Sequence, residues 1–185
     1  MLSEPSRRLA GDHHEVDGIL IQLEAALEAG DVESVDVRLD LFWARLAVHI
    51  RAEHLHLFPV IIAALQQSET SDEGLPSVGT AQTAIARLRE DHDFFMHELA
   101  NAVALVREIR TQRDAQTVRA SLNRVARIVS RVKERLAEHN QQEELQVYRW
   151  LTLLLEPAEL AKLASLINAE LGKQPPRFTG AVWTG

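Results

Sequence analysis

The sequence predicts an all-α protein: an antiparallel up-down-up-down four-helix bundle followed by a short fifth helix and an irregular C-terminal tail. Three observations predict this fold. The 185-residue chain is rich in Ala, Leu, Glu, Arg and Val, a composition that favours helix. Its apolar residues recur every three or four positions over long stretches, as on the buried face of a helix. The connections between most of these stretches are short, so consecutive helices are expected to pack as antiparallel neighbours.

The first two helices are predicted over residues 5–29 and 32–67. Gly30 suits the end of the first, and Asp31 can cap the start of the second. Pro59 lies inside the second pattern and is expected to kink or break that helix. The apolar stripes of the two helices are Leu9, Val16, Leu20, Leu23, Leu27 and Val35, Leu39, Phe42, Leu46, Leu57.

The second half of the chain repeats this pattern after a polar loop over residues 68–78. A third helix is predicted over 79–110, and a fourth follows a break near Thr111 and runs to about residue 155. A shorter fifth helix is predicted over 157–171, with Pro157 in its first turn. We interpret residues 5–172 as one helical domain (its core 5–155) and residues 173–185 as a tail whose Phe178 and Trp183 pack on the bundle.

A motif of histidine and glutamate occurs twice. The spacing His-x-x-x-Glu puts both side chains of each copy on one face of a helix, and each copy follows an Asp-His pair in the preceding helix. The two copies are Asp12-His13 with His49 and Glu53, and Asp91-His92 with His139 and Glu143. All four histidines and both glutamates interrupt apolar stripes, at depths that match in an antiparallel bundle. The six side chains are therefore expected at one level of the core.

A buried carboxylate must protonate, pair or bind a metal. The apolar stripes contain no Lys or Arg to pair with Glu53 and Glu143, so the sequence predicts a metal site. Both carboxylates can bridge two ions, which leaves open positions for a further ligand. The chain has no cysteine, so the ligands are nitrogen and oxygen, which suit iron or manganese better than zinc. The predicted ligands are His13, His49, Glu53, His92, His139 and Glu143.

Other polar residues lie close to this motif in the sequence. His14, His54 and Glu144 lie about 100° off the stripes, which favours solvated positions or contacts that support the ligands. His97 is expected to point away. His56 follows His49 by seven residues and returns to the same helix face; it is either an additional ligand or a hydrogen-bond donor to one.

Over residues 5–155 the sequence resembles the hemerythrin-like family, also called the HHE cation-binding domain. The residues that carry the resemblance are Asp12-His13, His49-xxx-Glu53-xxx-Leu57-Phe58-Pro59, Asp91-His92 and His139-xxx-Glu143-Glu144. The resemblance implies two non-haem iron ions with bridging carboxylates and an oxo or hydroxo bridge. It also implies activity toward dioxygen, nitric oxide, peroxide or iron itself. Met96 stands where oxygen-carrying hemerythrins have another histidine, which argues against simple reversible oxygen carriage.

Composition excludes several classes of partner. The net charge of −7 argues against nucleic acid, and no run of eighteen apolar residues predicts a membrane span. Without a signal peptide, a soluble cytoplasmic protein is expected, and a dimer is possible. Three functions follow: a di-iron protein that binds or reduces a small oxidant; a non-catalytic protein that stores, delivers or senses iron; or a metal-free helical interaction module.

Overall fold

The structure, a computed structural model, describes residues 2–68, 74–173 and 175. Regular structure in these residues is entirely helical, which confirms the all-α prediction. In chain order the α-helices are α1 (Glu4–Ala29), α2 (Val32–Ala52), α3 (Phe58–Gln67), α4 (Val78–Ile109), α5 (Ala115–Gln142), α6 (Tyr148–Leu154) and α7 (Pro157–Leu171).

The helices begin and end where the sequence provides capping groups. Gly30 has a left-handed backbone (φ 68°) and ends α1, because a residue without a Cβ adopts this conformation without strain. The side chains of Asp31, Ser77 and Asp114 accept hydrogen bonds from backbone N–H groups three residues on, which caps α2, α4 and α5. The short helix that the sequence predicts after the bundle, over residues 157–171, is α7 and has these bounds.

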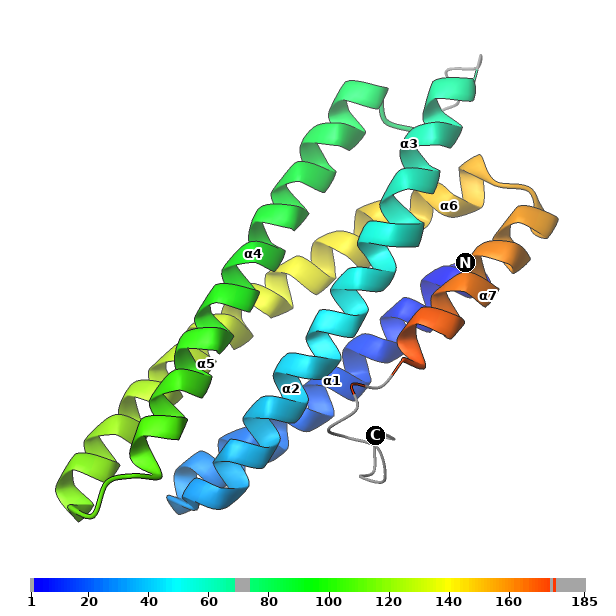
Figure 1. Cartoon of the computed structure of the whole chain (residues 1–185). Helices are drawn as coiled ribbons and strands as arrows, with labels where there is room; N and C mark the ends of the chain where they lie inside the picture. Colours follow the sequence, from blue (N-terminus) through cyan, green and yellow to red (C-terminus); the bar gives the residue numbers. More distant parts are fainter. Residues whose placement is uncertain (1, 69–73, 174, 176–185) are drawn as a thin grey trace.

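The predicted helix over 32–67 contains a π-helical turn, η1 (Glu53–Leu57), in which the Phe58 N–H bonds to the Glu53 carbonyl five residues back. The corresponding part of the fourth helix contains a second such turn, η2 (Glu143–Val147). The rod formed by α2, η1 and α3 still runs on as one element (Figure 1). The irregularity predicted at Pro59 therefore begins before the proline, at Glu53. The second π turn contains no proline, so proline is not required for a turn of this kind.

Each π turn changes which residues face the core. In a π turn the residues four and five positions on align with the first, instead of those three and four positions on. Leu57 and Phe58 are accordingly buried after Glu53, at 0% and 1% exposed. His56, three positions after Glu53, is turned away. The prediction that His56 returns to the ligand face is wrong, because it assumed an unbroken α-helical period.

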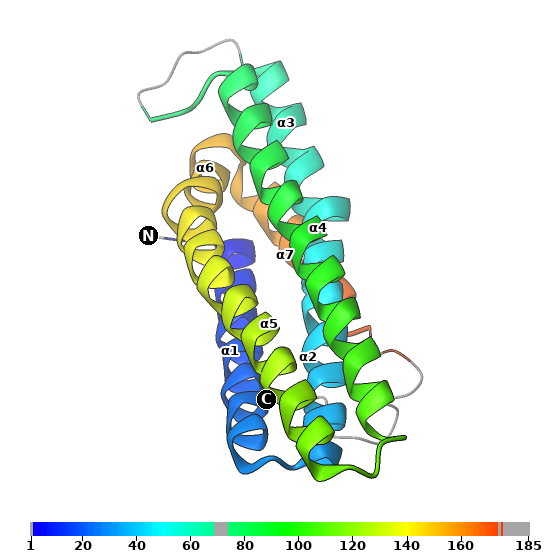
Figure 2. The ribbon, with the colours of Figure 1, turned by 90° about the vertical axis from the view of Figure 1, so that its left-hand side faces the viewer.

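The described part of the chain forms four long helical segments, namely α1, α2 with η1 and α3, α4, and α5 with η2 and α6. These segments pack side by side (Figures 1 and 2). α1 packs against α2, α2 against α4, α4 against α5, and α5 against α1. The apolar core forms two clusters of buried residues, one around Phe42 and Phe95 and the other around Phe58 and Tyr148. Along each of the four segments, the predicted ligands fall between residues of the first cluster and residues of the second. A polar layer thus separates two apolar cores.

α7 packs against both α1 and α2. Leu163, Ile167 and Leu171 are buried in the second apolar cluster. A capping box, in which Glu156 and Glu159 each accept a hydrogen bond from the other's backbone N–H, begins this helix. The expected packing of Phe178 and Trp183 lies outside the described residues.

One helix in the described part of the chain, the rod Val32–Gln67, is long and apolar enough to cross a membrane by length and composition alone. Half of its most apolar window is buried inside the protein, as in the core helix of a soluble protein. This is weak support for a membrane span, and the cytoplasmic location stays a prediction.

Candidate metal centre

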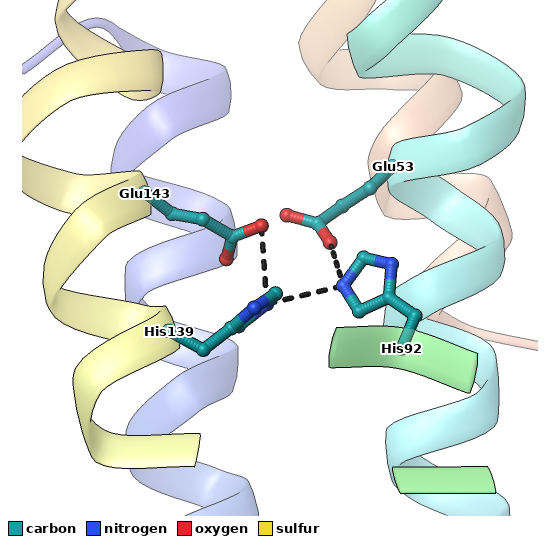
Figure 3. Close-up of side chains that lie close together, drawn as sticks. All are labelled: Glu53, His92, His139 and Glu143. Carbon is teal, nitrogen blue, oxygen red and sulfur yellow. Dashed lines mark hydrogen bonds and ion pairs between the residues drawn. The ribbon is translucent and has the colours of Figure 1, made fainter. Parts of the chain in front are cut away.

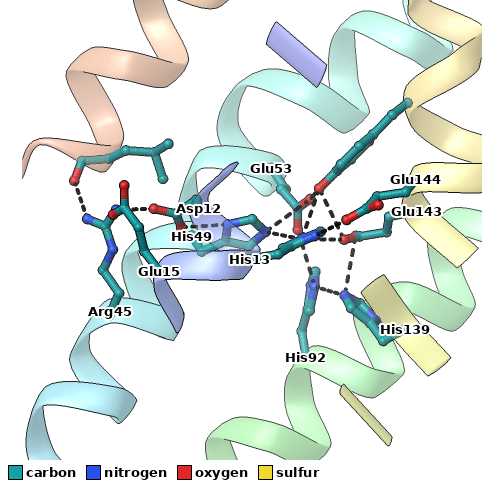
Figure 4. Close-up of polar contacts among 12 residues, drawn as sticks. Asp12, His13, Glu15, Arg45, His49, Glu53, His92, His139, Glu143 and Glu144 are labelled. Carbon is teal, nitrogen blue, oxygen red and sulfur yellow. Dashed lines mark hydrogen bonds and ion pairs between the residues drawn. The ribbon is translucent and has the colours of Figure 1, made fainter. Parts of the chain in front are cut away.

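The six predicted ligands converge between the two apolar clusters (Figures 3 and 4). They come from α1, from the junction of α2 with η1, from α4, and from the junction of α5 with η2. All of them are at most 4% exposed. The structure therefore contains a buried cluster of histidines and glutamates that could hold a metal ion, and their role as ligands stays a prediction.

One half of the cluster contains His92 and His139 (Figure 3). Their Nε2 atoms are 3.1 Å apart. The Glu53 Oε2 atom lies 3.3 Å from the Nε2 of His92, and the Glu143 Oε1 atom lies 3.3 Å from the Nε2 of His139. One ligand atom from each of these four residues can be chosen so that all lie within 4.8 Å of one another, as around a single ion.

The other half contains His13 and His49, whose Nε2 atoms are 3.2 Å apart (Figure 4). The other oxygen of each glutamate faces this half: Glu143 Oε2 is 3.4 Å from the Nε2 of His13, and Glu53 Oε1 is 3.5 Å from the Nε2 of His49. Each carboxylate thus offers one oxygen to each half. This is the arrangement that two bridging carboxylates require.

The outer nitrogen of each of the four imidazoles also has a partner. His49 Nδ1 lies 2.8 Å from Asp12 and His139 Nδ1 lies 3.3 Å from Asp91. A carboxylate acceptor fixes the proton on Nδ1 and leaves Nε2 free to face the centre. The Asp-His pairs are visible in the sequence, but each aspartate supports the histidine of a different helix, which the sequence pattern does not reveal.

Two residues predicted to lie off the stripes support the remaining histidines. Glu144 Oε1 is 2.8 Å from the Nδ1 of His13, and His54 Nε2 is 2.9 Å from the Nδ1 of His92. Of the two roles left open for these residues, the structure supports contact with the predicted ligands. His97 is exposed, as predicted, and His14 is exposed as well, which is the other of the two roles left open for it. His56 lies outside the cluster, with its Nε2 3.8 Å from Glu170.

Tyr148 is a member of the site that sequence reasoning missed. Its hydroxyl donates to Glu53 Oε1 at 2.8 Å and lies 3.2 Å from Glu143 Oε2 and 3.3 Å from His13 Nε2. Burial, together with the two carboxylates, raises the pKa of Tyr148 well above its ordinary value, so the hydroxyl keeps its proton and remains a donor. The available signal was the repeat itself, in which Tyr148 stands where the first copy has Phe58.

We expect Tyr148→Phe to destabilise the metal-free protein by about 1–3 kcal/mol, the usual cost of leaving a buried acceptor without its donor. Phenylalanine keeps the ring, so packing changes little. Urea unfolding of both proteins after metal removal measures the difference. Equal stability of the two proteins would show that the hydroxyl contributes no net hydrogen-bond energy to the carboxylates.

The charges of the cluster favour a cation. Burial disfavours the imidazolium form of His139, but the carboxylates of Glu143, Glu53 and Asp91 together outweigh burial and raise the pKa of His139 to about 9. The pKa of His49 likewise lies well above its ordinary value, against burial, because of Glu53 and Asp12. Burial alone would raise the pKa of Glu53, yet His49 holds it well below its usual range. The ionised carboxylates therefore favour positive charge in the cluster. Protons on the histidines or bound metal ions can supply this charge.

Two buried carboxylate oxygens, Glu53 Oε2 and Glu143 Oε1, lack a hydrogen bond of acceptable geometry. Buried acceptors normally have a partner, and both oxygens face imidazole Nε2 atoms across the centre of the cluster. A bound cation would satisfy both. The donor set of imidazole nitrogens and carboxylate oxygens fits a first-row transition metal.

The chain matches no protein-family model, and no curated protein matches it.

Proposed function

We propose that this protein is a hemerythrin-like metal protein in which two metal ions occupy the two halves of the buried cluster. One observation carries the proposal: each glutamate offers one oxygen to a pair of histidines on either side. The proposed scaffold is an antiparallel up-down-up-down four-helix bundle with α7 added to its side. His13 and His49 would hold one ion, His92 and His139 the other, and Glu53 and Glu143 would bridge them.

We propose iron as the metal in both positions. The ligands are nitrogen and oxygen, and the whole sequence contains no cysteine, which favours iron or manganese over a thiolate-bound metal. Two ions with six protein ligands retain open coordination positions. Zinc is the less suitable candidate, because structural zinc sites are usually four-coordinate and closed.

The proposed activity is the binding or reduction of a small oxidant, namely dioxygen, nitric oxide or peroxide. The irons, when bound, supply the electrons and the open positions for this chemistry. A surface pocket between α1 and α5 has His13 and Glu144 in its wall. It offers a route from solvent to the half of the centre that contains His13 and His49. Around the centre, the two apolar clusters limit water, and Tyr148 holds a proton beside both carboxylates.

Iron storage, delivery or sensing is the alternative. The burial of all six side chains, each at most 4% exposed, favours it, because a centre with little solvent access exchanges ligands slowly. This alternative shares the metal site and differs in predicting metal-dependent stability with little turnover.

Elemental analysis of untagged protein, with an absorption spectrum recorded before and after dithionite, tests the proposal. We expect roughly two irons per chain and near-ultraviolet bands that reductant bleaches. Nitric oxide, dioxygen and peroxide are then added to the reduced sample, and a spectral change with turnover favours the oxidant reaction over storage. No metal after anaerobic iron loading would contradict the proposal.

A further inference from the structure

Arg45 is a buried arginine beside the candidate metal centre. It lies on α2, one turn before His49, and is 3% exposed. Its Nη2 donates to the carboxylates of Asp12 and Glu15, and its Nη1 donates to the backbone carbonyl of Leu171 at 3.1 Å. Since a buried guanidinium needs charged and hydrogen-bonding partners, the position of Arg45 depends on these three contacts.

These contacts link the C-terminal end of α7 to one half of the centre (Figure 4). Leu171 is the last residue of α7, and its carbonyl is among the groups at a helix end that need an external donor. Arg45 supplies the donor and holds Asp12 at the same time. Asp12 Oδ2 in turn lies 2.8 Å from the Nδ1 of His49. The orientation of the His49 ring therefore depends on the end of α7.

The other half of the centre provides a natural comparison. Arg135 contacts Asp91 through its Nε at 2.6 Å, and Asp91 Oδ2 lies 3.3 Å from the Nδ1 of His139. Here the arginine side chain is 41% exposed, and its guanidinium lies over the ring of Phe94. The same Arg-Asp-His arrangement thus occurs twice, buried beneath α7 in one half and facing solvent in the other.

We propose that Arg45 is a positioning residue that couples the docking of α7 to metal binding by His13 and His49. The proposal rests on the proposed function. Arg45 acts through Asp12 and does not touch the metal. Its planar fork is essential, because a lysine in its place reaches one of its partners but cannot hold the helix end and the carboxylate together.

Coupling of this kind is reciprocal. Docked α7 holds Asp12 and therefore the His49 ring, which strengthens metal binding. A bound metal fixes His49 and Asp12, which must then strengthen the docking of α7. The C-terminal end of α7 thus responds to metal binding by His13 and His49.

Arg45→Lys and the matched control Arg135→Lys test the proposal in the full-length chain. Anaerobic titration with Fe(II) against a competing chelator gives the affinities of the two positions. We expect Arg45→Lys to weaken metal binding at the His13 and His49 position by about 10-fold, the lower end of the effect of removing a partner that orients a metal ligand directly, because Arg45 acts through Asp12. We expect Arg135→Lys to change either affinity by less than about 3-fold, because the arginine side chain is 41% exposed and its ion pair is screened by solvent.

Hydrogen exchange of the α7 amides, with and without Fe(II), provides a readout that does not depend on activity. We expect iron to slow exchange near the C-terminal end of α7 in the original chain and in Arg135→Lys, but not in Arg45→Lys. If all three proteins bind two irons and the affinity of each position is the same in the three proteins, the coupling is overturned and the proposed function stands. If Arg45→Lys fails to fold, α7 exchange that iron does not alter in the original chain overturns the coupling. A chain that binds no iron overturns both proposals.

Discussion

Replacing Glu53 by glutamine is expected to reduce metal content from roughly two ions per chain to one or fewer. Glu53 offers one oxygen to each half of the centre, 3.5 Å from His49 and 3.3 Å from His92. The substitution replaces one of these oxygens by an amide nitrogen, which cannot bridge two ions, and removes the negative charge that both proposed ions share. Loss of an outer partner alone lowers metal affinity by about 10- to 100-fold. Loss of a bridging carboxylate must exceed that. Elemental analysis after loading with excess Fe(II) and gel filtration gives the stoichiometry.

Glu144→Gln is the matched control for this substitution. Glu144 lies next to the predicted bridging residue Glu143, but it contacts the outer nitrogen of His13 and its side chain is 35% exposed. We expect this variant to retain both ions with affinity lowered by about 10-fold. If Glu53→Gln kept two ions while Glu144→Gln lost them, Glu144 and not Glu53 would be the bridging carboxylate.

The positions of the predicted ligands follow from periodicity because each lies in a register that apolar residues define independently. His92 replaces an apolar residue between Leu88 and Phe95, which are both buried, so its direction is set by the stripe on either side. The same holds for His13 between Leu9 and Val16. These residues lie at similar distances along neighbouring helices, so their side chains meet in the core. Apolar residues with a 3.6-residue period are enough to predict this meeting.

Periodicity fails where the helix itself changes. The π turns begin at Glu53 and Glu143, and neither residue has a local propensity that predicts one. The turns bring Leu57 and Val147 to the core together with the residues that follow them. They also turn His56 outward, which a continuous α-helical period could not predict. Tertiary packing of these apolar residues outweighs the cost of the irregular hydrogen bonds.

The contacts that support the ligands depend on the rotation of one helix against another. Asp12 lies next to His13 in the sequence but contacts His49 on α2, and Arg45 reaches the end of α7. Spacing along one helix carries no information about such pairs. The sequence could therefore predict which residues lie in the polar layer, but not which residue orients which.

The metal-free protein is expected to lose stability as the pH rises from about 6.5 to 9. The pKa of His139 is raised to about 9 in the folded state, against about 6.5 when unfolded. A raised pKa contributes stability that is fully present below the unfolded value and is lost as the pH passes the folded one. For His139 this contribution is about 3 kcal/mol, from 1.36 kcal/mol per pKa unit. His49 shifts in the same direction.

At acid pH the dependence has the opposite sign, because the metal-free protein is expected to lose stability as the pH falls. The pKa of Glu53 is held low by His49 against the effect of burial, so its contribution is present above its unfolded value of about 4.5 and is lost as the pH falls. Maximum stability of the metal-free protein is therefore expected between about pH 5 and 6.5. Urea unfolding of the metal-free protein at several pH values measures this.

Metal binding must reverse the trend on the alkaline side. A metal requires neutral imidazoles and displaces the protons that the carboxylates hold on His49 and His139, so its affinity rises as the pH approaches 9. The stabilisation that a ligand gives grows with its affinity, and the stability of the loaded and metal-free proteins should diverge from pH 6.5 upward. A metal-free protein that became more stable over this range would contradict the charge arrangement. A constant difference between the two forms would show that metal does not replace protons at these histidines.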